Sequence, residues 1–165
     1  MKKCCVLVLA ALLLFSACSR AEALDGTLYA IASRVQNAIS KAADFVTAEE
    51  DFTADHIGSP AYLEEGVVCF GADGKTREFG VFRLTDRTKA AEFKETLRSY
   101  LKNEKEALSS LAELYPAEEI EARLALYENA TVGNEVMLVY YFVLDEKETA
   151  KALQALTGRE KKDGA

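Results

Sequence analysis

The chain has 165 residues, of which 50% are hydrophobic, and a formal net charge of −7. A chain of this size buries enough of its surface to fold as one domain without a disulfide or metal staple. Its acidity argues against nucleic-acid binding, because that affinity comes largely from basic contacts. Anionic lipid headgroups attract basic segments instead, so the domain is not expected to adhere to a membrane unaided.

The N-terminus has the layout of a secretory signal. Lys2 and Lys3 form a short basic region, and residues 6–15 form an apolar stretch without a charge. The uncharged run from Cys4 to Ser19 has 16 residues. A membrane-spanning helix needs about 20 residues, so a permanent transmembrane segment is the weaker interpretation.

The end of this run resembles the lipobox of bacterial lipoproteins. Phe15-Ser16-Ala17-Cys18 places a large apolar residue and two small residues before a cysteine. The resemblance implies cleavage after Ala17 and a diacylglycerol on the sulfur of Cys18, which would hold the domain on the outer face of the cell membrane. Each buried methylene contributes about 0.8 kcal/mol, so two chains such as palmitate anchor far more firmly than one. The alternative is a secreted protein without a lipid, cut after Ala23.

These features divide the chain into four parts: a signal peptide (1–17), the lipidated cysteine and a short tether (18–23), a single domain (24–158) and a polar tail that we expect to be disordered (159–165). The tether, Ser19 to Ala23, spans less than about 20 Å even when fully extended, which keeps the domain near the bilayer. Cys69 is the only thiol left unmodified, so no intrachain disulfide is expected. We expect it to be a buried small hydrophobe.

The first half of the domain predicts a helix, a connector and a hairpin. Apolar residues recur at steps of three and four between Leu24 and Phe45, and Asp25 or Thr27 can cap this helix. The helix either docks on the core or is exposed to a partner. Residues 47–65 read as an irregular acidic connector, with a helical turn at 53–57 that ends at Gly58. Strands at 67–70 and 78–84 flank an Asp-Gly turn.

The second half predicts a helix, a second hairpin and a last helix. The long helix runs from about Arg87 to Leu114 after the cap Asp86, and it is straight or bends near Asn103. Strands follow at 124–132 and 135–144, joined by Gly133-Asn134. The last helix is capped by Asp145 and ends at Gly158. The order α-β-β-α-β-β-α predicts an α+β fold with a four-stranded, mainly antiparallel sheet covered by helices.

A set of spread features carries a second resemblance. The features are Phe52 through Gly58, the strand 78–83, the charged helix after it, Tyr115-Pro116, the hairpin 126–143 and the helix cap Asp145. Together they make the chain, from roughly Phe52 to Leu156, similar to a family of mostly Firmicutes lipoproteins catalogued only as a domain of unknown function. The resemblance implies an exported, lipid-anchored domain with no established activity, and it supplies no catalytic residues.

No catalytic set is predicted. Gly74-Lys75-Thr76 lacks the first glycine of a phosphate-binding P-loop, because that position is Cys69, and a strand rather than a helix follows. His56 is the only histidine and lies between Asp55 and Ser59 in the sequence. It is a weak candidate for the base of a hydrolase, and otherwise a solvated or capping residue.

No metal or other cofactor is predicted either. Zinc prefers cysteine and histidine ligands, and one of each is too few for the common site. The acidic runs at 49–51 and 118–121 could offer oxygen ligands to calcium, but neither follows the calcium-loop spacing. We expect both runs to be solvated charge.

Tyrosines gather in the second half of the chain, at Tyr115, Tyr127, Tyr140 and Tyr141. They are expected at the edge of the core with their hydroxyls at the rim, or alternatively along a ligand groove, for which Tyr115 and Tyr140 are weak candidates. The sequence thus predicts a monomeric, membrane-tethered accessory or binding domain, with an envelope protein, wall component or small solute as its partner. The alternative is an extracytoplasmic hydrolase, which an apolar groove holding His56 near Ser59 and a carboxylate would favour.

Overall fold

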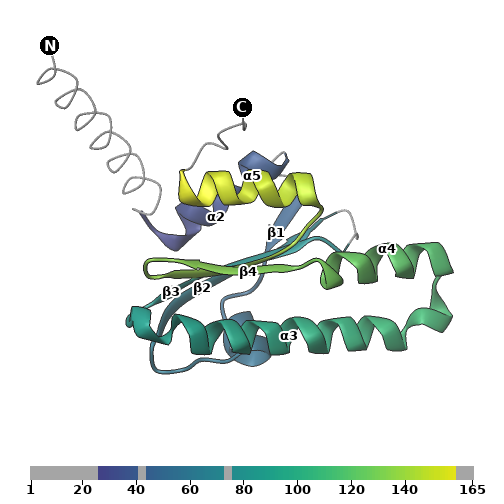
Figure 1. Ribbon diagram of the computed structural model, residues 1–165, viewed down its shortest axis with the longest axis horizontal. Coiled ribbons are helices and arrows are strands. Elements are labelled where there is room, and N and C mark those ends of the chain that lie inside the picture. The colour runs from purple at the N-terminus through teal and green to yellow at the C-terminus, as the bar shows by residue number, and fades with distance from the viewer. Residues whose placement is uncertain (1–25, 41–43, 73–75, 159–165) are drawn as a thin grey trace, which may run out of the picture.

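The computed structural model describes residues 26–40, 44–72 and 76–158. They form an α+β fold in which an antiparallel sheet of five strands, in the order β1-β2-β3-β5-β4, carries helices on both faces (Figure 1). The strands are β1 (Phe45–Thr47), β2 (Leu63–Gly71), β3 (Glu78–Leu84), β4 (Thr131–Glu135) and β5 (Leu138–Val143). The helices are α2 (Leu28–Ile39), α3 (Ala90–Ser110), α4 (Ala117–Glu128) and α5 (Glu146–Thr157). Shorter turns are η2 (Thr53–Ile57), η3 (Arg87–Lys89) and η4 (Ala112–Leu114).

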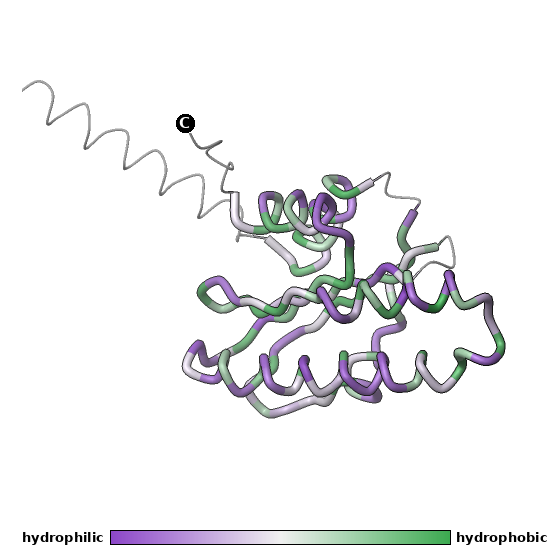
Figure 2. The backbone as a smooth tube through the Cα atoms, turned by 45° about the vertical axis from the view of Figure 1, so that its right-hand side comes forward, coloured by the Kyte–Doolittle hydropathy of each residue, from purple (hydrophilic) through white to green (hydrophobic). Residues whose placement is uncertain are grey.

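The sheet separates two cores. On one face Phe79 and Phe142 pack under α2 and α5, and on the other Phe82 and Tyr141 pack under α3. All six residues of β5 are buried, as expected for a central strand whose side chains alternate between two covered faces. Figure 2 shows this pattern, with hydrophobic segments in the sheet and hydrophilic positions along the outer side of α3.

Helix α2 docks on the core, so the docked alternative is confirmed. Leu28, Ile31 and Val35 are fully buried, and the hydroxyl of Thr27 accepts a hydrogen bond from the backbone N–H of Ala30 at 3.2 Å. The helix ends at Ile39, six residues before the predicted end at Phe45. Its last predicted turns would cover residues 41–43, which lie outside the described residues.

The prediction of four strands is wrong, because Phe45 to Thr47 form the additional edge strand β1. Phe45 pairs with Gly71 and Thr47 with Cys69 of β2. The ring of Phe45 lies edge-on to that of Phe79, with 5.5 Å between centroids. Aromatic and β-branched residues suit a pleated, half-buried surface, and here the neighbouring strand overrides the helical spacing.

The predicted strand at 124–132 is also wrong. Residues up to Glu128 belong to α4, and β4 begins at Thr131, so Gly133 and Asn134 lie inside the strand rather than in the turn. The turn falls at Val136, whose φ is 51°. Residues 117–123 are strong helix formers that follow a proline, which favours the helix although only Ile120 is buried.

The predicted strand at 67–70 is too short, because β2 begins at Leu63, inside the predicted connector, and ends at Gly71. Several other predictions are confirmed. Strand β3 spans residues 78–84 as expected, and the long helix is a continuous α3 between η3 and η4. The side chain of Asp86 accepts from the N–H of Thr88, and that of Asp145 accepts from the N–H of Glu148 at 2.7 Å. Gly158 ends α5 in the left-handed conformation, at φ 63°. The predicted Asp73-Gly74 turn, the signal peptide, the tether and the tail lie outside the described residues.

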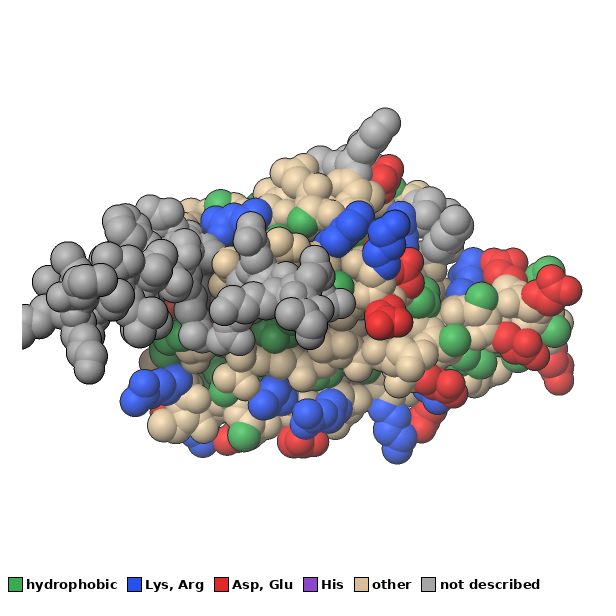
Figure 3. Space-filling view, turned by 45° about the horizontal axis from the view of Figure 1, so that its top comes forward, with side chains coloured by type: hydrophobic (Ala, Val, Ile, Leu, Met, Phe, Trp, Pro, Cys, Tyr) green, Lys and Arg blue, Asp and Glu red, His purple; other side chains and the backbone are tan. Residues whose placement is uncertain are grey.

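The hairpin of α3 and α4 projects past the end of the sheet (Figures 1 and 2). Lys105 and Glu128 form an ion pair at 2.9 Å that joins the two helices. Leu114 at the far end is 75% exposed. Figure 3 shows acidic side chains gathered around this end of the molecule. No helix within the described ranges has the length and apolar character needed to span a membrane.

Candidate functional site

A cleft lies beside β2 where its neighbour β1 leaves the sheet. The N–H of Ala48 donates to the carbonyl of Val68 at 2.8 Å, and the chain then turns away. The N-terminal half of β2 therefore has no strand on that side within the described sheet. A cleft of about 500 Å³ opens there, bounded by the 47–54 segment, the start of β2, Tyr29 and Ser59.

The cleft is acidic. Glu49 and Glu50 line it from the connector, and Glu64 and Glu65 line it from β2. The lining contains no lysine, arginine or histidine among the described residues. Arg83 of β3 lies opposite Glu65 of β2 in the strand register. Its guanidinium, however, donates a hydrogen bond to the carbonyl of Gly26 at 2.7 Å. Carboxylates lining one hollow concentrate negative potential, so the cleft attracts cationic groups.

Free hydrogen-bonding groups face this cleft from its floor. Because backbone groups alternate in direction along a strand, the N–H and C=O of Gly66 point to the same side as the carbonyl of Val68. On that side, no backbone hydrogen bond joins Gly66 to another described residue. Thr53 is 9% exposed and lines the cleft, and its hydroxyl has no hydrogen-bond partner within the described ranges.

Position 66 requires glycine because neighbouring side chains leave no room for a Cβ atom. A Cβ there would lie 2.9 Å from the hydroxyl oxygen of Thr53 and 2.8 Å from the Phe82 ring. Just before it, the pairing of β2 with β3 shifts between Leu63 and Glu65, which makes a β-bulge at Glu64. Bulges and charges are common protections of exposed sheet edges, and both occur here.

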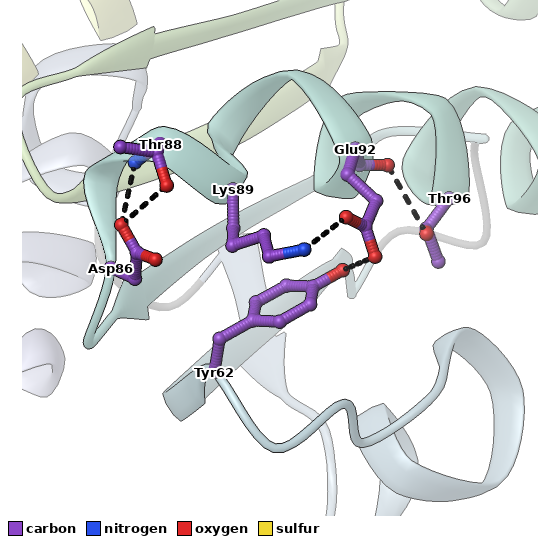
Figure 4. Close-up of polar contacts among 6 residues, drawn as sticks. All are labelled: Tyr62, Asp86, Thr88, Lys89, Glu92 and Thr96. Carbon is purple, nitrogen blue, oxygen red and sulfur yellow. Dashed lines mark hydrogen bonds and ion pairs between the residues drawn. The ribbon is translucent and has the colours of Figure 1, made fainter.

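The residue before β2 contacts the beginning of α3 (Figure 4). The hydroxyl of Tyr62, the residue before β2, donates to Glu92 at 3.0 Å, and the ammonium of Lys89 contacts the same carboxylate at 2.8 Å. Lys89 also lies over the Tyr62 ring, 5.5 Å from its centroid. The hydrogen bonds from Lys89 and Tyr62 lower the pKa of Glu92.

The second polar cluster is buried beneath α3. Glu78 on β3 is 3% exposed. Tyr100 donates to one carboxylate oxygen at 2.7 Å, Tyr141 donates to the same oxygen, and Tyr127 donates to the other at 3.3 Å. Burial raises the pKa of Glu78, although the hydrogen bonds from Tyr141 and Tyr100 oppose this shift. The pKa of each tyrosine is raised as well, chiefly by burial.

This buried cluster has the character of a structural polar core. Its four side chains come from β3, α3, α4 and β5, so the hydrogen bonds connect elements that are distant in sequence. The phenols stay protonated and act as donors, which satisfies the carboxyl group away from water. With Glu78 almost fully buried, its carboxyl is not presented to a solute.

His56, the weak candidate for the base of a hydrolase, lies on the surface. Its ring is exposed and stacks on Phe52, with 4.4 Å between centroids. Ser59 is exposed and lines the cleft, whereas His56 is not part of the lining. His56 and Ser59 therefore do not line this cleft together.

Cys69 is buried, as the sequence predicts. It is 0% exposed, and the side-chain amide of Gln36 donates to its sulfur at 3.3 Å. Burial raises the pKa of the thiol, which disfavours the reactive thiolate. This residue packs as a small hydrophobe.

The four tyrosines singled out by the sequence do not share one groove. Tyr127 and Tyr141 meet at Glu78, on the face covered by α3. Tyr140 lies on the opposite face, with its ring over Gly133. Tyr115 lies between α3 and α4, where the Arg123 guanidinium is 5.4 Å from its ring centroid. The groove alternative is therefore unsupported for Tyr115 and Tyr140.

Within the described ranges, no group of three or more histidine, cysteine, aspartate and glutamate side chains is placed to hold a metal ion. Cys18, Ala17 and Ala23 lie outside these ranges. Neither the lipidation site nor the cleavage sites have a structural description.

Sequence reasoning missed the cleft and the buried carboxyl. Glu78 begins a strand whose other residues, apart from Arg83, are apolar or glycine, and that single acid is the available signal. Thr53 and Gly66 gave no signal, because their role depends on the contact between the connector and β2. For the acidic residues at 49 and 50 the sequence predicts solvated charge, with calcium ligation as the alternative, and it does not place them beside β2.

The comparisons with known proteins add no relative. No protein-family model, curated protein or solved structure matches this chain. The resemblance to the lipoprotein family therefore stays a prediction.

Proposed function

We propose that this chain is an exported bacterial lipoprotein whose folded part is a membrane-tethered accessory or binding domain. Its location is argued from the lipobox-like Phe15-Ser16-Ala17-Cys18, which follows a basic start and an apolar run. A diacylglycerol on Cys18 would provide the anchor. The cleft beside β2 is the observation that supports binding, because it combines a hollow, four carboxylates and free hydrogen-bonding groups in one place.

The geometry of the domain start is compatible with a cleft near the membrane. Gly26 is tied to β3 by the hydrogen bond from Arg83, and Tyr29 lines the cleft. An extended chain from Cys18 to Tyr29 spans at most about 40 Å, so the cleft would lie within that distance of the bilayer surface. The acidic domain is repelled by anionic headgroups, so the anchor rather than the charge would hold it there.

Membrane fractionation with mass spectrometry of the N-terminus tests the anchor. We expect the mature chain in the membrane fraction, starting at a diacylated Cys18. The variant Cys18→Ala should lose the anchor, whereas Cys5→Ala, which changes a cysteine inside the signal, should keep it. Membrane retention of Cys18→Ala would contradict lipidation. An unmodified chain that starts after Ala23 would identify a secreted protein instead.

A further inference from the structure

The cleft beside β2 has the features of a site for strand addition. Extended peptides bind sheet edges through their backbone groups, and nearby pockets and charges select the side chains. Here β1 covers only the last part of β2, and the next backbone groups that face outward are those of Gly66. This unpaired edge of β2 lies inside the cleft, with the 47–54 segment as the facing wall, rather than along a flat exposed surface.

We propose that this cleft binds an extended, lysine- or arginine-bearing segment of a partner protein, which pairs with β2 at Gly66 in the position that β1 leaves after Ala48. This inference rests on the proposed binding function and specifies the class of its partner. The N–H and C=O of Gly66 form the backbone pairs. Thr53, a residue that is 9% exposed, lines the cleft, and its hydroxyl, which has no partner among the described residues, takes up a further polar group of the segment.

Charge selects this occupant over a second copy of the chain. The walls of the cleft carry four carboxylates, from Glu49 and Glu50 on one side and from Glu64 and Glu65 on the other, and these oppose a like-charged edge. The whole chain has a formal net charge of −7. Two copies pairing through β2 would bring these glutamates together, and closely placed like charges oppose such a contact. A cationic segment, in contrast, meets carboxylates on both walls of the cleft. The charges that oppose pairing between two copies therefore favour binding of this segment.

The bulge at Glu64 limits how far the added strand extends. Beyond Gly66 the regular ladder is interrupted, so pairing is confined to the stretch next to Val68. Most of the selectivity then comes from the glutamates and from Thr53, and backbone pairing supplies the orientation. We therefore expect weak binding that depends strongly on salt.

The probe is a short peptide in which lysine and valine alternate, titrated by calorimetry into the full chain solubilised in detergent. The double variant Glu64→Lys/Glu65→Lys should weaken binding by at least about tenfold, which corresponds to 1.4 kcal/mol. The matched control is Glu113→Lys/Glu121→Lys, which changes the charge equally at exposed positions away from the cleft. Equal loss in both double variants would show non-specific attraction and overturn the proposal.

A second pair of probes separates strand addition from a simple cation site. A version of the peptide with methyl groups on alternate backbone nitrogens keeps every charge but loses the N–H donors at those positions. It should bind at least about tenfold more weakly than the unmodified peptide. Hydrogen exchange at the Gly66 amide should slow when the unmodified peptide binds. Equal affinity of the methylated peptide, or unchanged exchange at Gly66, would overturn strand addition.

Thr53→Val tests the hydroxyl and should weaken binding a few-fold without unfolding the domain. An unchanged affinity would remove Thr53 from the site. The anchor and the cleft fail separately in these measurements. A chain without lipid that still binds the peptide contradicts only the anchor, and a lipidated chain that does not bind contradicts only the cleft.

Discussion

At the scale of single residues, the buried Glu78 and its three tyrosines form the most unusual environment in the domain. A carboxyl group that is 3% exposed normally requires hydrogen bonds or a counter-charge, and here phenol hydroxyls supply them. Burial raises the pKa of Glu78, and the nearby carboxylate of Glu104 adds to this shift. The group therefore couples the stability of the domain to pH.

The variant Glu78→Gln tests this coupling. The pKa of Glu78 in the folded domain lies above its ordinary value of 4.5, so the folded state holds this proton more tightly than the unfolded state. The stabilisation is fully present below the unfolded pKa and is lost as pH rises through the folded pKa. We expect the free energy of unfolding of the wild type to fall relative to that of Glu78→Gln as pH rises above 4.5.

Urea denaturation at a series of pH values measures this difference. Glu121→Gln, at an exposed glutamate of α4, serves as the control and should show no such trend. A difference between wild type and Glu78→Gln that is flat or rises with pH would contradict a raised pKa. The hydrogen bond from Tyr100 can be examined in parallel, because Tyr100→Phe should cost about 1–3 kcal/mol of stability.

At the scale of elements, the helices differ in how firmly their ends are defined. Helix α5 has a side-chain cap at Asp145 and a left-handed glycine at its other end, and it packs against α2. Helix α4 has neither a side-chain cap nor more than one buried residue. Caps and amphipathic spacing are local signals, which explains why the sequence predicted α5 correctly and missed α4.

The cap of α5 provides a direct test. Asp145→Ala removes the acceptor for the N–H of Glu148, at 2.7 Å, and should lower the free energy of unfolding by about 1 kcal/mol. Asp145→Asn keeps an acceptor at the same position and should retain most of the stability. Thermal or urea denaturation distinguishes the two. Equal losses in both variants would mean that the charge of Asp145, rather than its hydrogen bond, stabilises the helix.

At the scale of the whole molecule, a sheet buried on both faces carries a projecting helical hairpin on one side (Figure 1). The middle of the sheet gains stability from both cores, whereas the end of α3 and most of α4 contact little besides each other. Local opening is easiest where few apolar contacts must be broken. The hairpin is therefore expected to open before the sheet.

Native-state hydrogen exchange monitors that opening residue by residue. Amides of α4 should exchange at a much lower opening free energy than those of β5, because α4 buries only Ile120 and β5 buries all six of its residues. Amides of α5, which is docked on α2, should resemble the sheet. Equal protection of α4 and β5 would show that the hairpin and the sheet open as one unit.

The sequence by itself determined those features that depend on neighbours along the chain. The β3 strand, the long α3 helix, the caps Asp86 and Asp145 and the burial of Cys69 all followed from spacing and local hydrogen-bonding capacity. The lipobox-like segment belongs to the same class of signal, and it carries the proposed location.

Only the tertiary structure decided where the sheet ends and what gathers there. Phe45 to Thr47 became a strand because β2 offered an unpaired edge, and the cleft exists because β1 is too short to cover that edge. Glu78 became a buried carboxyl because three tyrosines from α3, α4 and β5 converge on it. Contacts between segments far apart in sequence set these environments, and the pattern of any one segment does not encode which partners it will meet.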